Sequence, residues 1–210
     1  MKTISKTISK TILTTICICS ISISVTAQRL DILGGINLTG IKYKTAQTKT
    51  DESGNVGFHV GLAVFVPFNA SKFKKDDDSE GYGLIPTVQY VRKGSSNNSV
   101  INNAAADIKL GFLQLNLPLA YTANNIDIGV GPYIAYAMSG KKQYRVGNGE
   151  NEKIDFTNEL GRMDYGVGIQ FTLYMFKFQY DLGLANLAKG NGDKANTRSF
   201  SFGLNIPLVQ

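Results

Sequence analysis

The chain has 210 residues, a formal net charge of +6 and 43% hydrophobic residues, which is enough sequence for one domain and hardly for two. The basic residues are scattered and do not cluster, so the modest charge argues against a nucleic-acid-binding protein. Cys17 and Cys19 are the two cysteines and both lie near the N-terminus. The rest of the chain therefore has no disulfide framework and no thiol chemistry.

Residues 1–27 have the layout of a secretory signal peptide. Three lysines without an acid precede an isoleucine-rich stretch, and Val25-Thr26-Ala27 supplies the small residues that a signal peptidase reads. Cleavage after Ala27 would remove those three lysines and lower the net charge from +6 to +3. We expect residues 28–210 to form the mature domain.

Beyond residue 28, no apolar run approaches the roughly 18 residues that a transmembrane helix requires. The other structure that satisfies every backbone group in a bilayer is a closed β-barrel, whose sequence signature is alternation with a period of two. Three segments alternate clearly, and five more do so less regularly. The clear strands are 165–173, 176–184 and 200–208, and the others are 30–40, 56–66, 84–93, 113–121 and 126–138. A slip of parity near Phe112 predicts a β-bulge.

The connections between these eight strands also alternate in length. Long polar loops are predicted at 44–55, 94–106, 139–160 and 186–197, and tight turns at 122–125 and 173–175. Short turns at one end and long loops at the other are typical of outer-membrane barrels. The second connection, 67–81, breaks this rule because it is long and charged.

The composition of the second face of each strand indicates which face points outward. That face consists mostly of Gly, Ala, Ser, Thr, Asn and Gln, which suits a narrow barrel interior better than a water-facing surface. The few charged residues on it are Asp31, Lys93, Asp127, Lys177 and Asp181. The apolar face carries aromatic residues toward strand ends, at Tyr90, Tyr121, Tyr136, Tyr165, Phe176 and Phe200, which favours interfacial girdles. The sequence thus predicts an all-β, eight-stranded antiparallel up-and-down transmembrane β-barrel in the cell outer membrane, with a soluble lipocalin-like periplasmic barrel as the alternative.

Few residues are candidates for chemistry. His59, the single histidine, is expected in the lumen, where a hydrogen-bonding role is favoured over catalysis. Asp76-Asp77-Asp78 lacks the ligand spacing of a calcium loop, with Glu80 too close. The glycine-rich segments at 147–149 and 190–193 lack the strand–helix context of a phosphate loop. We therefore assign no catalytic, cofactor-binding or metal-ligating residue.

A polar ladder is expected inside the barrel. Lys177, Gln179 and Asp181 share the inner face of one strand and are placed to interact with Asp127 or Asp31. Charges in a narrow interior need partners. The structural interpretation is a hydrogen-bonded plug, which is favoured, and the functional one is a narrow ion path.

Five short segments, in this order along the chain, resemble the PorT-like outer-membrane β-barrel family of Bacteroidota. They are Gly34-Gly35-Ile36-Asn37, Tyr90-Val91-Arg92-Lys93-Gly94, Leu113-Gln114-Leu115-Asn116-Leu117-Pro118-Leu119, Gly131-Pro132-Tyr133 and Tyr180-Asp181-Leu182-Gly183-Leu184-Ala185-Asn186-Leu187. The resemblance implies an eight-stranded barrel in the outer membrane of a Gram-negative bacterium, and no catalytic residues; the family's namesake belongs to a secretion system. Two features depart from the family pattern: the charged insertion at 72–80, and a C-terminus that lacks the usual aromatic residue.

The function expected from the sequence is a non-enzymatic barrel that anchors and presents extracellular loops, as a component of an envelope or secretion assembly. Its partners would be outer-membrane lipid and envelope proteins that contact the long loops. The alternative is a narrow channel or small-ligand-binding barrel, although eight strands leave little room for a pore.

Overall fold

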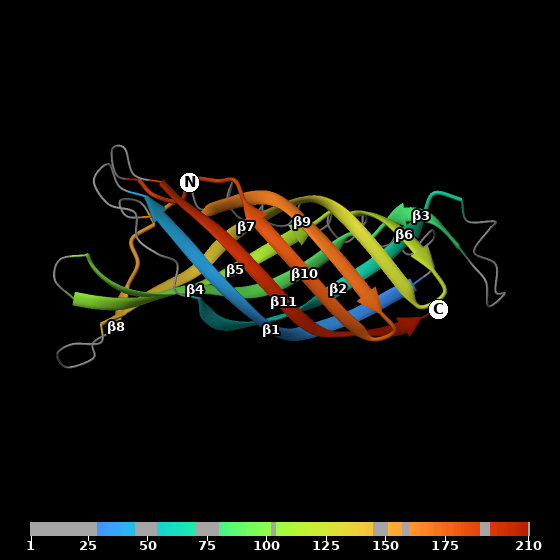
Figure 1. Ribbon diagram of the computed structural model, residues 1–210, viewed down its shortest axis with the longest axis horizontal. Coiled ribbons are helices and arrows are strands. Elements are labelled where there is room, and N and C mark those ends of the chain that lie inside the picture. The colour runs from blue at the N-terminus through green and yellow to red at the C-terminus, as the bar shows by residue number, and fades with distance from the viewer. Residues whose placement is uncertain are drawn as a thin grey trace, which may run out of the picture.

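The computed structural model describes residues 29–44, 54–69, 80–101, 104–144, 151–156, 160–189 and 194–209, which form one elongated β-barrel (Figure 1). The described residues include no helix that is long and apolar enough to cross a membrane. In chain order the strands are β1 (Arg29–Lys44), β2 (Asn55–Pro67), β3 (Glu80–Leu84), β4 (Thr87–Ile101), β5 (Ala104–Asn116), β6 (Leu119–Ala123), β7 (Ile126–Tyr144), β8 (Asn151–Lys153), β9 (Met163–Leu173), β10 (Phe176–Gly183) and β11 (Lys194–Val209).

The sheet closes on itself. β1 pairs with β11, with Leu38 opposite Phe200, and also with β2, with Ile36 opposite Phe58. The pairs β11–β10, β10–β9, β9–β7, β7–β5, β5–β4 and β4–β2 complete the ring, and every pair is antiparallel. Because β3 with β4, and β5 with β6, each make up one wall strand, the ring has eight. The predicted eight-stranded up-and-down barrel is confirmed.

The two ends of the barrel differ, and we name them by their connections. The turn end carries the β6–β7 and β9–β10 turns and lies at the right of Figure 1, beside β3 and β6. The loop end, at the left, carries the β1–β2, β4–β5, β7–β9 and β10–β11 connections and the short strand β8. Both predicted tight turns are present, at Asn124-Asn125 and Tyr174-Met175. Asn124 and Tyr174 have positive φ, 50° and 53°, which Asn tolerates far better than Tyr.

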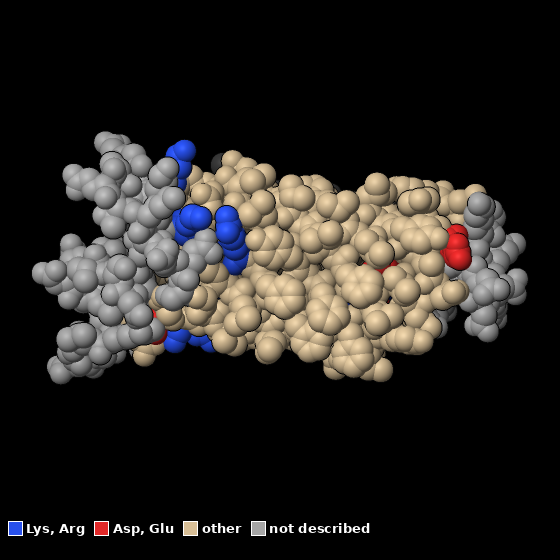
Figure 2. Space-filling view, viewed as in Figure 1, with Lys and Arg blue, Asp and Glu red and all other residues tan. Residues whose placement is uncertain are grey.

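The apolar face of each strand points out of the barrel. Ile36, Ile169 and Phe202 are exposed, while their neighbours Asn37, Gln170 and Ser201 are buried in the lumen. In the view of Figure 2 the outer surface is accordingly almost wholly uncharged between the two ends, where Lys and Arg gather at the left and an acidic side chain at the right, and only a small acidic spot shows between the side chains of the wall. The predicted facing of the strands is confirmed.

Proline residues interrupt two of the predicted strands. Segment 84–93 divides at Ile85-Pro86 into β3 and β4, and segment 113–121 divides at Leu117-Pro118 into β5 and β6. Proline has no N–H to donate to the sheet. Three backbone bonds bridge these breaks: Val64 N–H donates to Pro86 O at 3.0 Å, Ile85 N–H to Pro118 O at 3.1 Å, and Leu117 N–H to Pro132 O at 3.0 Å. The prediction of two uninterrupted strands was wrong at these points.

Three predicted loops were too long. β4 and β5 continue to Ile101 and Ala104 through the predicted loop 94–106, β7 runs on to Tyr144, and β11 begins at Lys194. A bulge lies near Phe112, because the β5–β7 register shifts between Gly111 and Phe112, but its extra residue is Met138 on β7, and β5 itself keeps its parity. Many of the extra strand residues, such as 95–99 and 139–143, are of polar or small types, so the apolar alternation that marked the other strands is missing there.

Several predictions concern residues outside the described ranges. These are the signal peptide at 1–27, the acidic run at 76–78 with most of the insertion at 72–80, and the glycine-rich segments at 147–149 and 190–193. They stay predictions.

Candidate functional site: a filled lumen with an apolar cap

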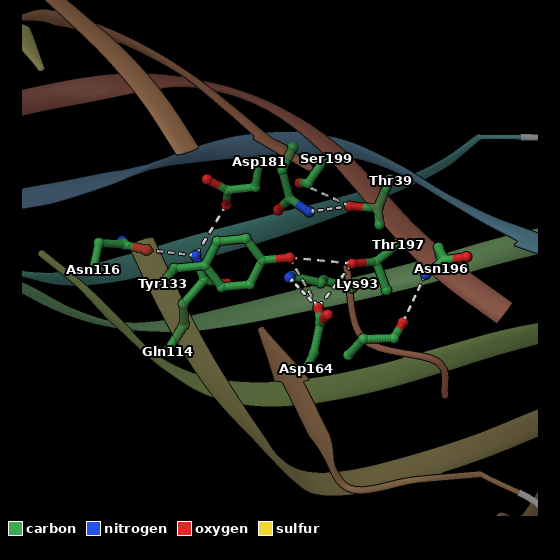
Figure 3. Close-up of polar contacts among 12 residues, drawn as sticks. Thr39, Lys93, Gln114, Asn116, Tyr133, Asp164, Asp181, Asn196, Thr197 and Ser199 are labelled. Carbon is green, nitrogen blue, oxygen red and sulfur yellow. Dashed lines mark hydrogen bonds and ion pairs between the residues drawn. The ribbon is translucent and has the colours of Figure 1, made fainter. Parts of the chain in front are cut away.

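The first polar layer in the lumen is built around an ion pair between β4 and β9. Lys93 Nζ lies 2.9 Å from Asp164 Oδ2, and both side chains are 0% exposed. Asp164 Oδ2 also accepts hydrogen bonds from Thr197 at 2.8 Å and Tyr133 at 3.3 Å (Figure 3). Lys93 Nζ lies 4.7 Å and 5.3 Å from the ring centroids of Tyr133 and Phe112. These contacts join β4, β5, β7, β9 and β11 across the barrel.

The second layer lies closer to the turn end and joins β5 to β10. Gln114 Nε2 donates to Asp181 Oδ2 at 2.9 Å and to Asn116 Oδ1 at 2.8 Å (Figure 3). Gln179 Nε2 donates to both carboxylate oxygens of Asp181, at 2.8 and 3.0 Å. A small cavity of about 10 Å³ adjoins this layer, lined in part by Asn116, Gln179 and Asp181. It has room for about one water molecule.

The third layer closes the turn end of the lumen. Arg29 donates to Asp127 at 2.6 Å and to Asp31 at 3.0 Å, and Asn205 Nδ2 donates to Asp31 at 2.7 Å. Lys177 is buried beside them and interacts electrostatically with Asp181, Asp127 and Asp31. Asp181 is bonded to Gln114 and Gln179 in the second layer, whereas Asp127 and Asp31 are bonded to Arg29 in the third. The polar ladder predicted along Lys177, Gln179 and Asp181 is thus divided between two layers.

An apolar cap closes the loop end. The segment after β8 turns inward, so that Ile154, Phe156 and Leu160 are buried against the inner faces of β5 and β7. The full cluster comprises Ile41, Ile108, Leu110, Phe112, Tyr133, Ala135, Ala137, Ile154, Phe156, Leu160, Leu187 and Ala195. Gly140 makes room for it, because a Cβ there would lie 2.8 Å from the Phe156 ring. A polar plug and an apolar cap thus fill the lumen from end to end.

The candidate residues for chemistry form no catalytic arrangement among the described residues. His59 is buried in the lumen, its Nδ1 has no hydrogen-bond partner, and Lys177 is a charged neighbour. Within the described ranges, no three His, Cys, Asp or Glu residues come together as a metal site would require.

Sequence reasoning missed Asp164, Arg29 and the cap. Asp164 has the inward parity of the 165–173 strand but precedes its predicted start by one residue, and Arg29 precedes the first predicted strand in the same way. Ile154, Phe156 and Leu160 were assigned to a polar loop. Their apolar side chains within a polar stretch were the signal that they fold inward.

This architecture defines an outer-membrane β-barrel: a closed antiparallel ring, an apolar outer surface, tight turns at one end and long connections at the other. The chain belongs to the outer membrane protein beta-barrel domain family, whose sequence model matches residues 27–189. The protein is therefore located in the cell outer membrane, which excludes the soluble periplasmic barrel.

Solved structures of other outer-membrane proteins are similar to this chain. Ail, the attachment invasion locus protein of Yersinia pestis, is 14% identical with a TM-score of 0.42, over 86% of this chain and 99% of that one. The structure of Ail in complex with the heparin analogue sucrose octasulfate has a TM-score of 0.40 and 14% identity, over 85% of this chain and 99% of that one. Neisserial surface protein A is 11% identical with a TM-score of 0.46, over 84% and 96%. The comparison with curated proteins found no match.

Proposed function

We propose that this protein is a non-enzymatic outer-membrane anchor that presents its loop-end connections to protein partners in an envelope or secretion assembly. The observation that carries the proposal is the filled lumen. Ion pairs and hydrogen bonds join opposite walls in three layers, and the apolar cap closes the loop end. A barrel of this kind offers its surroundings a rigid rim and loops.

The β4–β5 hairpin supports this assignment. Its two strands continue antiparallel pairing from Gly94 opposite Lys109 to Asn97 opposite Ala106, and after an irregularity pair again at Ile101 opposite Ala104, well past the last large outward-facing apolar residue of β5, Leu113. A paired ribbon is stiffer than an unpaired loop of the same length, so it is suited to holding a contact surface away from the membrane. The motif order of the PorT-like group, whose namesake belongs to a secretion system, supports the same role. We place the chain in that group, with 1–27 as signal peptide and 28–210 as the barrel domain.

The experiment replaces residues 96–107 with Asn-Gly, so that a two-residue turn follows the Ser95–Ile108 pair. As a matched control, residues 70–79 at the opposite end of the barrel are replaced with Gly-Gly. Both variants should keep the gel-mobility shift between boiled and unboiled samples that marks a closed barrel. We expect cross-linking in the native host, followed by affinity purification, to lose the protein partners of the first variant only.

An unchanged set of partners in the first variant would contradict the proposal. So would conductance in planar bilayers, because a filled and capped lumen should be silent under voltage.

A further inference from the structure

Three lysines lie side by side on the outer wall at the loop end. Lys109 on β5 is directly opposite Lys141 on β7, and Lys141 is directly opposite Lys153 on β8. Directly paired residues of antiparallel strands share a face, and neighbouring strands are about 4.8 Å apart. The three side chains therefore form one row about 10 Å long. We call it the lysine row.

The lysine row faces outward. Ile108 and Leu110, which flank Lys109, are buried in the cap, as is Ile154 next to Lys153. Gly140, next to Lys141, also faces the cap, because a Cβ at this position would meet the side chains of Leu110 and Phe156. Since successive side chains of a strand alternate between faces, the three lysines point away from the lumen.

The row lies just beyond the apolar band. Met138 is the last large apolar residue on the outer face of β7, and Lys141 follows it by three residues, or about 10 Å along the strand. Strand tilt reduces this to about 8 Å of height. The headgroup layer of one leaflet is about 5–8 Å thick. The ammonium groups therefore lie at headgroup level, on the side that carries the long loops.

The row itself consists of three cations directly opposite one another, with no acid among them. Like charges directly opposite one another across strands are destabilising. Lys109 donates to the Gln143 amide oxygen at 2.9 Å, which supplies no negative charge. Asp107 lies two residues from Lys109 on the outer face of β5, and Glu152 and Asp155 lie one and two residues from Lys153, so acids border the row without standing in it. Such a row at this depth is complementary to an anion with several phosphate oxygens.

We propose that Lys109, Lys141 and Lys153 form a binding site for the phosphorylated headgroup of an outer-leaflet lipid. The phosphate oxygens accept hydrogen bonds from the ammonium groups, and the acyl chains lie along the apolar wall below Met138. This site is independent of the proposed protein partners.

The test measures equilibrium binding of lipid A in detergent micelles to three folded proteins: wild type, Lys109→Gln/Lys141→Gln/Lys153→Gln, and the control Lys189→Gln/Lys194→Gln/Arg198→Gln. The control removes the same charge at the same end but near β10 and β11, away from the row. Diphosphorylated and dephosphorylated lipid A are the two probes, and the boiling shift verifies folding.

We expect wild type to prefer the diphosphorylated lipid, the row variant to lose affinity by about tenfold or more, and the control to stay within about twofold of wild type. An equal loss of affinity in the row variant and the control variant would show that the lipid is attracted by the overall charge of the loop end, and would contradict a specific site. Equal binding of the dephosphorylated lipid would overturn the assignment to phosphate. If the triple variant does not fold, Lys141→Gln alone serves, with a loss of at least about threefold expected and an unchanged affinity counting against the site.

Discussion

Removing one partner of the Lys93–Asp164 pair should destabilise the barrel far more than removing both. The Nζ–Oδ2 distance of 2.9 Å gives a Coulomb attraction of about 6 kcal/mol at an effective dielectric constant of about 20. Both groups are fully buried, so their desolvation offsets much of that energy. Asp164→Asn removes the counter-charge of the buried Lys93 ammonium, which keeps a neutral amide oxygen and two aromatic faces as its neighbours. We expect a loss of about 3–5 kcal/mol in the free energy of unfolding.

The complementary variant Lys93→Met should cost less than Asp164→Asn, because Asp164 keeps the hydrogen bonds from Thr197 and Tyr133. The double variant Lys93→Met/Asp164→Asn should be more stable than the worse single variant, since neither charge is left alone. Urea unfolding in lipid vesicles, followed by the boiled-against-unboiled mobility shift, measures all three. Exposed Glu152→Gln is the control, with an expected change within about 0.5 kcal/mol.

Additive single effects in that double-mutant cycle would refute the reasoning, because they would mean that the two groups contribute independently. A cost of less than about 1 kcal/mol for Asp164→Asn would refute it as well, by showing that the layer is effectively solvated.

Three further predictions test the turn, the cap and the outer wall. Tyr174→Gly should raise the free energy of unfolding by about 0.4–1 kcal/mol because Tyr174 has φ of 53°, whereas Asn124→Gly should change it less. The midpoints of urea unfolding of the two variants and the wild type measure the difference, and a lower midpoint for Tyr174→Gly would contradict the prediction. Gly140→Val should displace the Phe156 ring and expose the segment around it to protease while the barrel wall stays intact, and an unchanged digestion pattern would be inconsistent with the cap. Ile169→Lys, on the lipid-facing side of β9, should destabilise the barrel in vesicles by about 2–4 kcal/mol, and a neutral effect would argue that this position does not face lipid.

Alternation predicted the wall because one face of each strand must suit lipid and the other a narrow polar interior. Phe176, Phe178 and Phe202 show this directly, since they are neighbours on the outer surface with ring centroids of Phe202 5.0 and 6.2 Å from those of Phe178 and Phe176. The same rule placed Lys177 and Asp181 in the lumen. Near the membrane centre, the environment constrains both faces of a strand.

Beyond the apolar band the outer face no longer contacts lipid, so alternation no longer marks the strands. The strand ends and the cap at the loop end were therefore predicted wrongly. The outer ribbon of β4 and β5 is held by backbone pairing, which sequence alternation does not record. The pairing of Lys93 with Asp164 depends on register across several strands, and no local pattern specifies it. The cap depends on Phe156 returning to the lumen from a connection that reads as polar.

The prolines of the wall have a consequence for how the barrel moves. Pro86, Pro118 and Pro132 lie on neighbouring wall strands near the turn end, and each removes one donor from the sheet at about the same height. The strands β3 and β6, which lie between these prolines and the turn end, are therefore joined to β4 and β5 by fewer backbone hydrogen bonds. Local opening follows the least-bonded boundary, so the amide hydrogens of Tyr82 and Tyr121 should exchange with solvent deuterium before those of the β1–β11 pair. The barrel would then loosen first through one side of its wall at the turn end, while the cap and the Lys93–Asp164 pair stay closed.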